Sequence, residues 1–301
     1  MTIRLGTNPI AWSNDDMRTL GGTTPLATCL SEARLAGYSG IELGHKFPRE
    51  AGPLGELLGE HQLVLISGWY SSALLERSPA EEIAAIDGHA GLLNALGCEV
   101  LILAETSRAV HGRREVPLSA SPSLSSDEIR GLALGVSEVA KHVAGRGLRL
   151  AYHHHLGTVI ETGDEIDAFM DAAGPEVALL LDTGHAYAAG VDPVALASTY
   201  AERIVHVHCK DVRLEILEMV QASEMSFLDG VVAGMFTVPG DGCIDFNAAL
   251  GPVARAGYAG WLVVEAEQDP EKANPLTYAR AGYDHLSAVA ETVGFSLQGE
   301  R

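Results

Sequence analysis

The chain has little cysteine and no long apolar run. Its four cysteines, at positions 29, 98, 209 and 243, are scattered, and no two have the C-x-x-C spacing of a redox or zinc-binding pair. We interpret them as free thiols in a reducing compartment, which predicts a cytoplasmic protein. No uninterrupted apolar run reaches the roughly 18 residues of a membrane-spanning helix. The first residues, MTIRLGTNPIAW, also lack the apolar core of a secretory signal.

Basic residues are scarce as well. The 301 residues include 20 Lys and Arg against 40 Asp and Glu, for a formal net charge of -20. A surface this acidic repels phosphate backbones and anionic lipids, which argues against nucleic acid or a membrane as partner. The first apolar run is followed by GTNPIAW, which is not the glycine-rich loop that a dinucleotide-binding open sheet needs. The expected partner is therefore a small molecule.

What the sequence does contain is a repeated alternation of short apolar runs and longer amphipathic segments. Eight runs predict parallel strands buried on both faces, at residues 3–6, 40–43, 63–67, 100–103, 148–153, 177–181, 204–208 and 261–265. Helical patterns lie between and after them, at residues 25–36, 81–96, 128–144, 163–172, 193–201 and 278–293. Gly37, Gly97 and Gly257 follow helical patterns, as helix-ending glycines do. Eight alternations predict an α/β fold, a (β/α)8 barrel, formed by a single domain over residues 1–301.

Two connections are longer than usual. Residues 108–126 are rich in Ser, Pro and Arg, and residues 213–242 mix apolar and acidic residues with room for one or two short helices. Both follow strand ends, so we expect both to lie over the catalytic face of the barrel.

Polar residues gather where the predicted strands end. Six of the twelve histidines fall at three consecutive strand ends, at positions 153, 154, 155, 185, 206 and 208. Asp182 and Glu265 stand at matching positions. A single histidine in a barrel strand is more often a hydrogen-bonded packing residue, but this set predicts a site for a divalent metal such as Mn, Co, Zn or Fe.

Alternation along a strand indicates which histidines share a face. His153 and His155 should point into the barrel end and His154 away from it. His208 lies at the tip of its strand and is the stronger ligand candidate. His206 lies deeper and could be a packing histidine or a support for a ligand.

The motifs resemble those of a known superfamily. LLLDTGH at 179–185, HVHCKD at 206–211 and Glu265 resemble the xylose isomerase-like barrels, which include sugar epimerases and endonuclease IV-type proteins. The resemblance implies a metal held by Glu, Asp, His and Glu, of which the last three correspond to Asp182, His208 and Glu265. His153 stands where the first Glu is expected. This departure disfavours the two-carboxylate mechanism of the epimerases.

A closer resemblance covers nearly the whole chain. TNPIAWSNDD, GGTTPL, GIELGHKFPRE, SGWYSS, AYHHHLGTVIET, VHCKDVR, FTVPGDGCIDF and VVEAEQDPEKANPLTYAR look like the myo-inosose-2 dehydratases of inositol catabolism. The resemblance implies dehydration of 2-keto-myo-inositol, one divalent metal (Mn or Co), and a homo-oligomer such as a dimer or tetramer. Glutathione is also linked to that family, although no residue of this sequence indicates a site for it.

On this hypothesis the strand-end residues take definite roles. We expect His153, Asp182, His208 and Glu265 to bind the metal, and His155 and His185 to act as base and acid, with Glu265 as an alternative base. Lys210 could polarise the substrate carbonyl or simply pair with Asp211.

We expect six further residues to contact the substrate. Trp12 and Trp69 could equally cap the barrel core, and Glu42 and Glu105 could be surface charges. The six are Asn8, Trp12, Glu42, Lys46, Trp69 and Glu105.

Three alternatives remain at this stage. An isomerase or epimerase would share the metal and the enediolate chemistry. An endonuclease IV-like enzyme would need a basic groove, which the net charge of -20 opposes. A sugar-binding barrel without activity would not need converging imidazoles and carboxylates.

Overall fold

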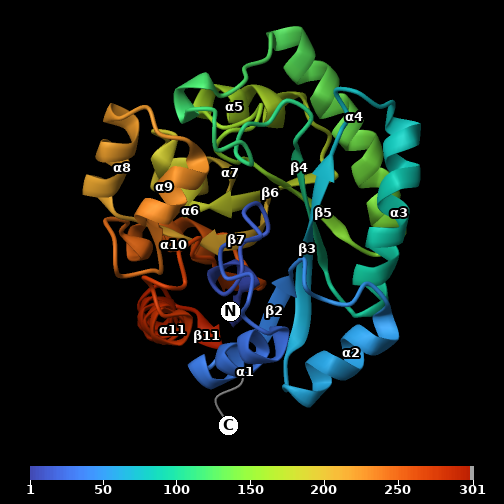
Figure 1. Cartoon of the computed structure of the whole chain (residues 1–301). Coiled ribbons are helices and arrows are strands. Elements are labelled where there is room, and N and C mark those ends of the chain that lie inside the picture. The colour runs from blue at the N-terminus through green and yellow to red at the C-terminus, as the bar shows by residue number, and fades with distance from the viewer. Residues whose placement is uncertain (299–301) are drawn as a thin grey trace.

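Eight parallel strands close into a barrel in the computed structural model, which describes residues 1–298 (Figure 1). In order around the barrel they are β1 (Thr2–Thr7), β2 (Gly40–Leu43), β3 (Val64–Ser72), β4 (Val100–Glu105), β5 (Arg149–His153), β6 (Val177–Asp182), β7 (Ile204–Cys209) and β10 (Trp261–Val264). Pairing of β1 with β10, from Arg4 opposite Trp261 to Thr7 opposite Val264, closes the circle. The predicted barrel and its eight strand segments are therefore confirmed.

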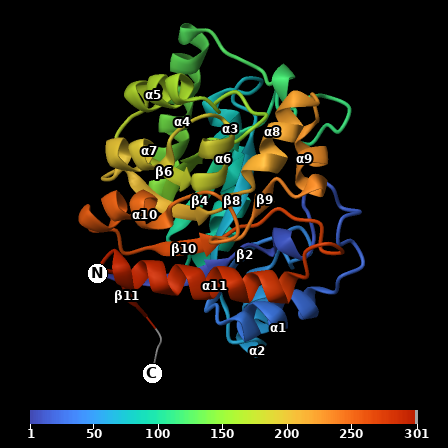
Figure 2. The same ribbon diagram turned by 90° about the vertical axis from the view of Figure 1, so that its left-hand side faces the viewer.

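Helices surround this barrel. Figure 1 shows α2, α3 and α4 outside β3, β4 and β5, and Figure 2 shows α11 running along another side. The main helices are α1 (Leu26–Ala36), α2 (Ala51–Glu60), α3 (Pro79–Ala95), α4 (Ser126–Gly145), α5 (Gly163–Ala172), α6 (Thr183–Ala188), α7 (Pro193–Tyr200), α10 (Phe246–Arg255) and α11 (Pro275–Thr292). Ser78, Ser125 and Thr162 each begin a helix with a capping box, in which a glutamate three residues later bonds back to the cap.

The two long connections carry the remaining elements. A 3-10 turn, η2 (Leu118–Ala120), lies in the first, and the second holds the adjacent helices α8 (Leu214–Ala222) and α9 (Phe227–Ala233), as predicted. A short antiparallel pair, β8 (Asp211–Val212) with β9 (Phe236–Thr237), ties the ends of the second connection together. The turn η1 (Pro9–Ala11) follows β1. The short strand β11 (Ser296–Leu297) pairs in parallel with the beginning of β1. Within residues 1–298, none of the helices has the length and apolar character needed to cross a membrane.

Glycine is required at the end of α1. Gly37 has a φ of 113°, a left-handed conformation that L side chains rarely adopt. A Cβ atom there would also lie within 2.9 Å of the Tyr283 ring. The turn from α1 to β2 therefore depends on the glycine that the sequence placed at this helix end.

The barrel interior below the strand ends is filled by apolar side chains. Trp261, Ile66 and Val263 form one buried cluster within it. Gly6 and Gly40 make room for it, since a Cβ on Gly6 would lie 2.1 Å from Ile66 and one on Gly40 would lie 2.7 Å from Trp261. The barrel is thus a packed core, and polar chemistry is confined to its carboxyl end.

Two leucines of α1 provide a test of the packing between helix and barrel. Leu30 is fully buried, whereas Leu35 is 62% exposed. Leu30→Ala should lower the free energy of unfolding by about 2–5 kcal/mol because it leaves a cavity. Leu35→Ala should change it by less than about 0.5 kcal/mol. Urea denaturation of both variants measures the difference, and equal effects would contradict this placement of α1.

Candidate active site

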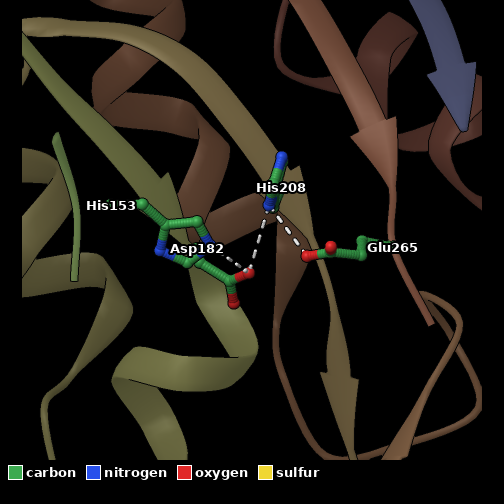
Figure 3. A group of neighbouring side chains, drawn as sticks. All are labelled: His153, Asp182, His208 and Glu265. Atoms are coloured by element: carbon green, nitrogen blue, oxygen red, sulfur yellow. Dashed lines mark ion pairs between the residues drawn. The ribbon is translucent and has the colours of Figure 1, made fainter. Parts of the chain in front are cut away.

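Four side chains predicted as metal ligands converge at the carboxyl end of the barrel. They come from four consecutive strands: His153 ends β5, Asp182 ends β6, His208 lies in β7 and Glu265 follows β10 (Figure 3). One donor atom from each lies within 4.8 Å of the others. His208 Nδ1 is 2.8 Å from Glu265 Oε2 and 3.5 Å from Asp182 Oδ2, and His153 Nε2 is 3.8 Å from the same Asp182 oxygen.

Three of these side chains are oriented by a bond made through their other polar atom. His153 Nδ1 donates to the His154 carbonyl at 2.6 Å, which leaves Nε2 with a free lone pair. Asp182 Oδ1 accepts from the His185 backbone N–H at the start of α6, which leaves Oδ2 free. His208 Nε2 donates to Glu42 Oε1 at 3.2 Å, which directs Nδ1 toward Asp182 and Glu265. Such outer contacts are how proteins set the tautomer and direction of metal-binding side chains.

The donor atoms make no hydrogen bond. Asp182 Oδ2, His208 Nδ1 and Glu265 Oε2 are buried and lie at ion-pair distance from one another or from the Lys210 ammonium. Burying polar atoms without partners is costly, so their convergence calls for a cation. Two imidazoles and two carboxylates suit a divalent ion of borderline hardness. The residues present therefore fit a divalent metal.

Glu42 extends from β2 into the same region, and both of its carboxylate oxygens accept hydrogen bonds there. Its Oε1 accepts from Ser67 at 2.5 Å and from His206 at 2.8 Å, in addition to His208. Its Oε2 accepts from Asn8 at 2.7 Å. Burial would raise the pKa of Glu42, but His208 and His206 outweigh it and hold that pKa well below the ordinary value. Glu42 therefore stays ionised and orients the His208 ring, and His206 belongs to the same hydrogen-bond network.

A second buried cluster, made of His155, His185, Lys210 and Glu267, lies beside the four proposed metal ligands. Lys210 Nζ donates to Glu267 Oε1 at 2.6 Å and to His185 Nε2 at 2.8 Å, and lies 3.2 Å from Glu265 Oε2. Burial alone would lower the pKa of Lys210, but the surrounding carboxylates Asp182, Glu265 and Glu267 raise it, so the side chain remains an ammonium. Burial raises the pKa of Glu267 to about 7 despite this lysine.

Asp211 is not the partner of Lys210. Its carboxylate instead accepts the backbone N–H groups of Val212, Gly240, Gly242 and Ile244. The pairing that the sequence left open is therefore excluded, and Asp211 holds the chain between β9 and α10.

His155 faces the pocket as a neutral imidazole. Its Nδ1 donates to the Leu156 carbonyl at 2.8 Å, which leaves Nε2 as an acceptor. Burial lowers the pKa of His155 well below its ordinary value, and His111 and His153 lower it further. Its ring packs on His185, with centroids 3.7 Å apart, and on Phe227 of α9 at 5.3 Å. As the alternation predicted, His154 lies away from this group, buried with neither ring nitrogen bonded.

A pocket opens over both groups. Its walls come from strand ends and from the β1–α1 and β4–α4 connections. The lining residues are Asn8, Ile10, Asp15, Asp16, Glu42, Leu43, Trp69, Ile102, His111, His153, His155, His208, Glu265 and Glu267.

Several lining residues were not among the predicted site residues. Asp15 and Asp16 come from the loop after η1, and His111 comes from the first long connection, with Nε2 3.8 Å from Asp16 Oδ1. Nothing in a loop sequence shows which of its residues turns inward. Glu267 could have been found, because it follows Glu265 by two positions and an extended chain places both on one face.

Three residues expected to contact the substrate do not line the pocket. Trp12 is buried and donates to Glu32 at 2.7 Å. Lys46 donates to the carbonyl oxygens of residues 21, 22 and 24, and so holds the loop above η1. Glu105 accepts from Ser72 and from the backbone N–H of residue 74. All three make their contacts within the surrounding segments, and none of them lines this pocket.

Two residues expected to act on the substrate, His185 in proton transfer and Lys210 in polarising the carbonyl, lie behind the pocket wall. His185 and Lys210 are buried and do not line the pocket. His185 Nε2 is occupied by Lys210, so this imidazole has no free atom directed at a substrate. His155, which packs on the His185 ring, lines the pocket, whereas His185 does not.

Comparison with known proteins identifies the family. The family model of the xylose isomerase-like TIM barrel matches residues 30–289. The rhizopine catabolism protein MocC of Rhizobium meliloti is 47% identical over 99% of this chain and 91% of its own length. An inosose dehydratase of Geobacillus thermodenitrificans is 43% identical over 97% of this chain and 98% of its own length.

A solved structure agrees in fold. The IOLI protein with a bound zinc atom superposes with a TM-score of 0.68 at 17% identity, covering 96% of this chain and 99% of that one. The family model, the relatives and the solved structure agree. The chain belongs to the xylose isomerase-like TIM barrel family and, within it, to the inosose dehydratases.

Proposed function

We propose that this protein is a metal-dependent hydro-lyase that dehydrates 2-keto-myo-inositol to 3D-(3,5/4)-trihydroxycyclohexane-1,2-dione in the breakdown of myo-inositol. The observation that carries the proposal is the convergence of four metal-ligand side chains with uncommitted donor atoms on one pocket. The names of relatives that are 40–43% identical over nearly the whole chain support the substrate.

The metal site would consist of His153, Asp182, His208 and Glu265. A bound divalent ion, Mn or Co, supplies Lewis acidity that lowers the pKa of the proton next to a ketone. Glu42 keeps His208 aimed at this site, and the His154 carbonyl does the same for His153. Glu265 is assigned to ligation because its free oxygen faces His208 Nδ1.

His155 is the proposed base. It lines the pocket, it is uncharged, and its Nε2 has a lone pair that no other residue occupies. An imidazole in that state can take the proton α to the ketone. His185, whose ring packs against it at a tilt, is proposed as a positioning residue that holds the ring in place.

Glu267 is the proposed acid for the departing hydroxyl. Its Oε1 is bound to Lys210, whereas its Oε2 is buried in the pocket wall without a partner. His155 takes the α proton, and the electrons of the C–H bond form the enolate. The C–O bond on the next carbon then breaks as the carbonyl re-forms, and a proton from Glu267 lets the hydroxyl leave as water. The enol that remains tautomerises to the dione.

The rest of the pocket suits an uncharged ring with many hydroxyls. Asp15 and Asp16 offer carboxylate acceptors, and the Trp69 ring provides an apolar wall near His153 and His155. The Asn8 and Glu42 polar atoms are bound to each other, so they shape the pocket floor.

A second candidate substrate comes from rhizopine catabolism. The relative named for that pathway is 47% identical to this chain, more than the inosose dehydratases at 40–43%. The same pocket and metal ligands would serve a rhizopine-derived compound, so turnover of 2-keto-myo-inositol is the first test.

Mass spectrometry tests the reaction. When 2-keto-myo-inositol is incubated with EDTA-stripped protein, the mass of the compound should stay unchanged. Added Mn or Co should give a product lighter by one water. An unchanged mass together with deuterium uptake from heavy water would indicate enolisation without elimination, and hence an isomerase. No change of either kind with metal present would count against this substrate.

The support of His208 by Glu42 is tested through metal affinity. Glu42→Gln removes the negative charge behind His208 and should weaken Mn binding about 10–100-fold. Glu105→Gln is the matched control, because Glu105 is equally buried but makes no hydrogen bond to a proposed metal ligand. Titration of metal into both apo-proteins gives the affinities. A Glu42→Gln protein that binds Mn as tightly as the control would remove Glu42 from this role.

The role of His155 is tested by separating metal binding from turnover. His155→Gln should retain one metal ion per chain while kcat/KM falls by roughly 100- to 10,000-fold, since a general base contributes about that much. His154→Leu, which changes the neighbouring side chain on the other face, should keep most of the activity. Equal losses in the two variants would indicate damage to the segment that follows β5 rather than loss of a base.

A further inference from the structure

The second buried cluster resembles a metal site that already holds a cation. His155, His185 and Glu267 each offer a donor atom, and these atoms lie within 4.8 Å of one another. None of them belongs to the four-residue metal site. Two imidazoles and one carboxylate are a common set of protein ligands in metal sites.

The Lys210 ammonium lies among the acceptors of this group. Its Nζ is 2.6 Å from Glu267 Oε1 and 2.8 Å from His185 Nε2. It also lies 3.2 Å from Glu265 Oε2 and 3.7 Å from Asp182 Oδ2, which are the free oxygens of the first site. The ammonium therefore shares two carboxylates with the proposed metal, as a second metal ion in a two-metal centre would.

The fold builds a place for this lysine. A Cβ on Gly184 would lie 2.5–2.8 Å from the Lys210 side-chain stem, so glycine at the start of α6 leaves the space that the stem fills. Thr183 Oγ1 donates to the Lys210 carbonyl at 2.7 Å and accepts from its N–H at 3.1 Å. The Phe236 ring covers the ammonium at 4.7 Å. The lysine is thus fixed from its backbone to its charged end.

We propose that Lys210 serves as a built-in second cation, which takes the position of a second metal ion and keeps this centre mononuclear. This inference rests on the metal site proposed above but not on the identity of the substrate. The ammonium lies within 3.7 Å of Asp182, Glu265 and Glu267, so it adds positive charge to this acidic centre without a second metal ion. Buried charges need such compensation, since each is costly when unpaired.

The proposal predicts what happens when the ammonium is removed. In Lys210→Met, an unbranched apolar side chain fills the stem position but leaves Glu267 uncompensated and His185 Nε2 uncovered. The His155, His185 and Glu267 donors should then bind a second divalent ion. Lys210→Arg, which keeps a positive charge, is the matched control. In the double variant Lys210→Met/His185→Gln, the second site loses a donor.

The experiment is metal analysis of apo-proteins reloaded with Mn and desalted, together with electron paramagnetic resonance. Wild type and Lys210→Arg should hold one Mn per chain with the spectrum of an isolated ion. Lys210→Met should hold two, with a spectrum altered by coupling between them, and the double variant should return to one. A single ion in Lys210→Met, or a second ion that persists in the double variant, would overturn the proposal.

Two further outcomes keep the tests separate. A wild type that binds no metal would contradict the proposed metal site itself. If Lys210→Met does not fold, wild type is titrated with excess Mn alongside His185→Gln. Saturation at one ion in wild type supports the proposal, and a second wild-type ion that is lost in His185→Gln would refute it.

Discussion

The concentration of buried negative charge at one end of the barrel is the constraint on which the rest of the site depends. Asp182, Glu265 and Glu267 all lie within 3.7 Å of the Lys210 ammonium, and Glu42 lies behind His208. A low-dielectric interior tolerates such a group only when cations and hydrogen-bond donors compensate it. Lys210 and the donors around Glu42 supply part of this compensation, and the free atoms that remain define where a divalent ion fits.

Orientation of the imidazoles follows from ordinary backbone geometry and one long reach across the barrel. His153 and His155 each bond the carbonyl of the next residue, which fixes the protonated nitrogen and directs the other one inward. Glu42 does the same for His208 from the far side of the barrel. Two chemically identical side chains at the end of β5 thereby face different groups, and the proposed roles follow from this, His153 toward the metal and His155 toward the substrate.

Long connections complete the site without carrying its central chemistry. Phe227 of α9 packs against the His155 ring, and His111 approaches Asp16 across the pocket. Trp12, Lys46 and Glu105 anchor the segments from which the pocket walls come. Substrate selection therefore depends on loops that the barrel holds in place.

The sequence by itself determined the barrel, its strands and the four residues brought together at its carboxyl end. Strand periodicity is local, so alternation alone placed His153 and His155 on one face and His154 on the other. Only the tertiary structure decided which polar atoms remain free. Glu42 is engaged by residues more than 160 positions away, Lys210 pairs with Glu267 rather than its neighbour Asp211, and Asp16 turns into the pocket. Those outcomes depend on distances between segments far apart in the chain, which no local pattern encodes.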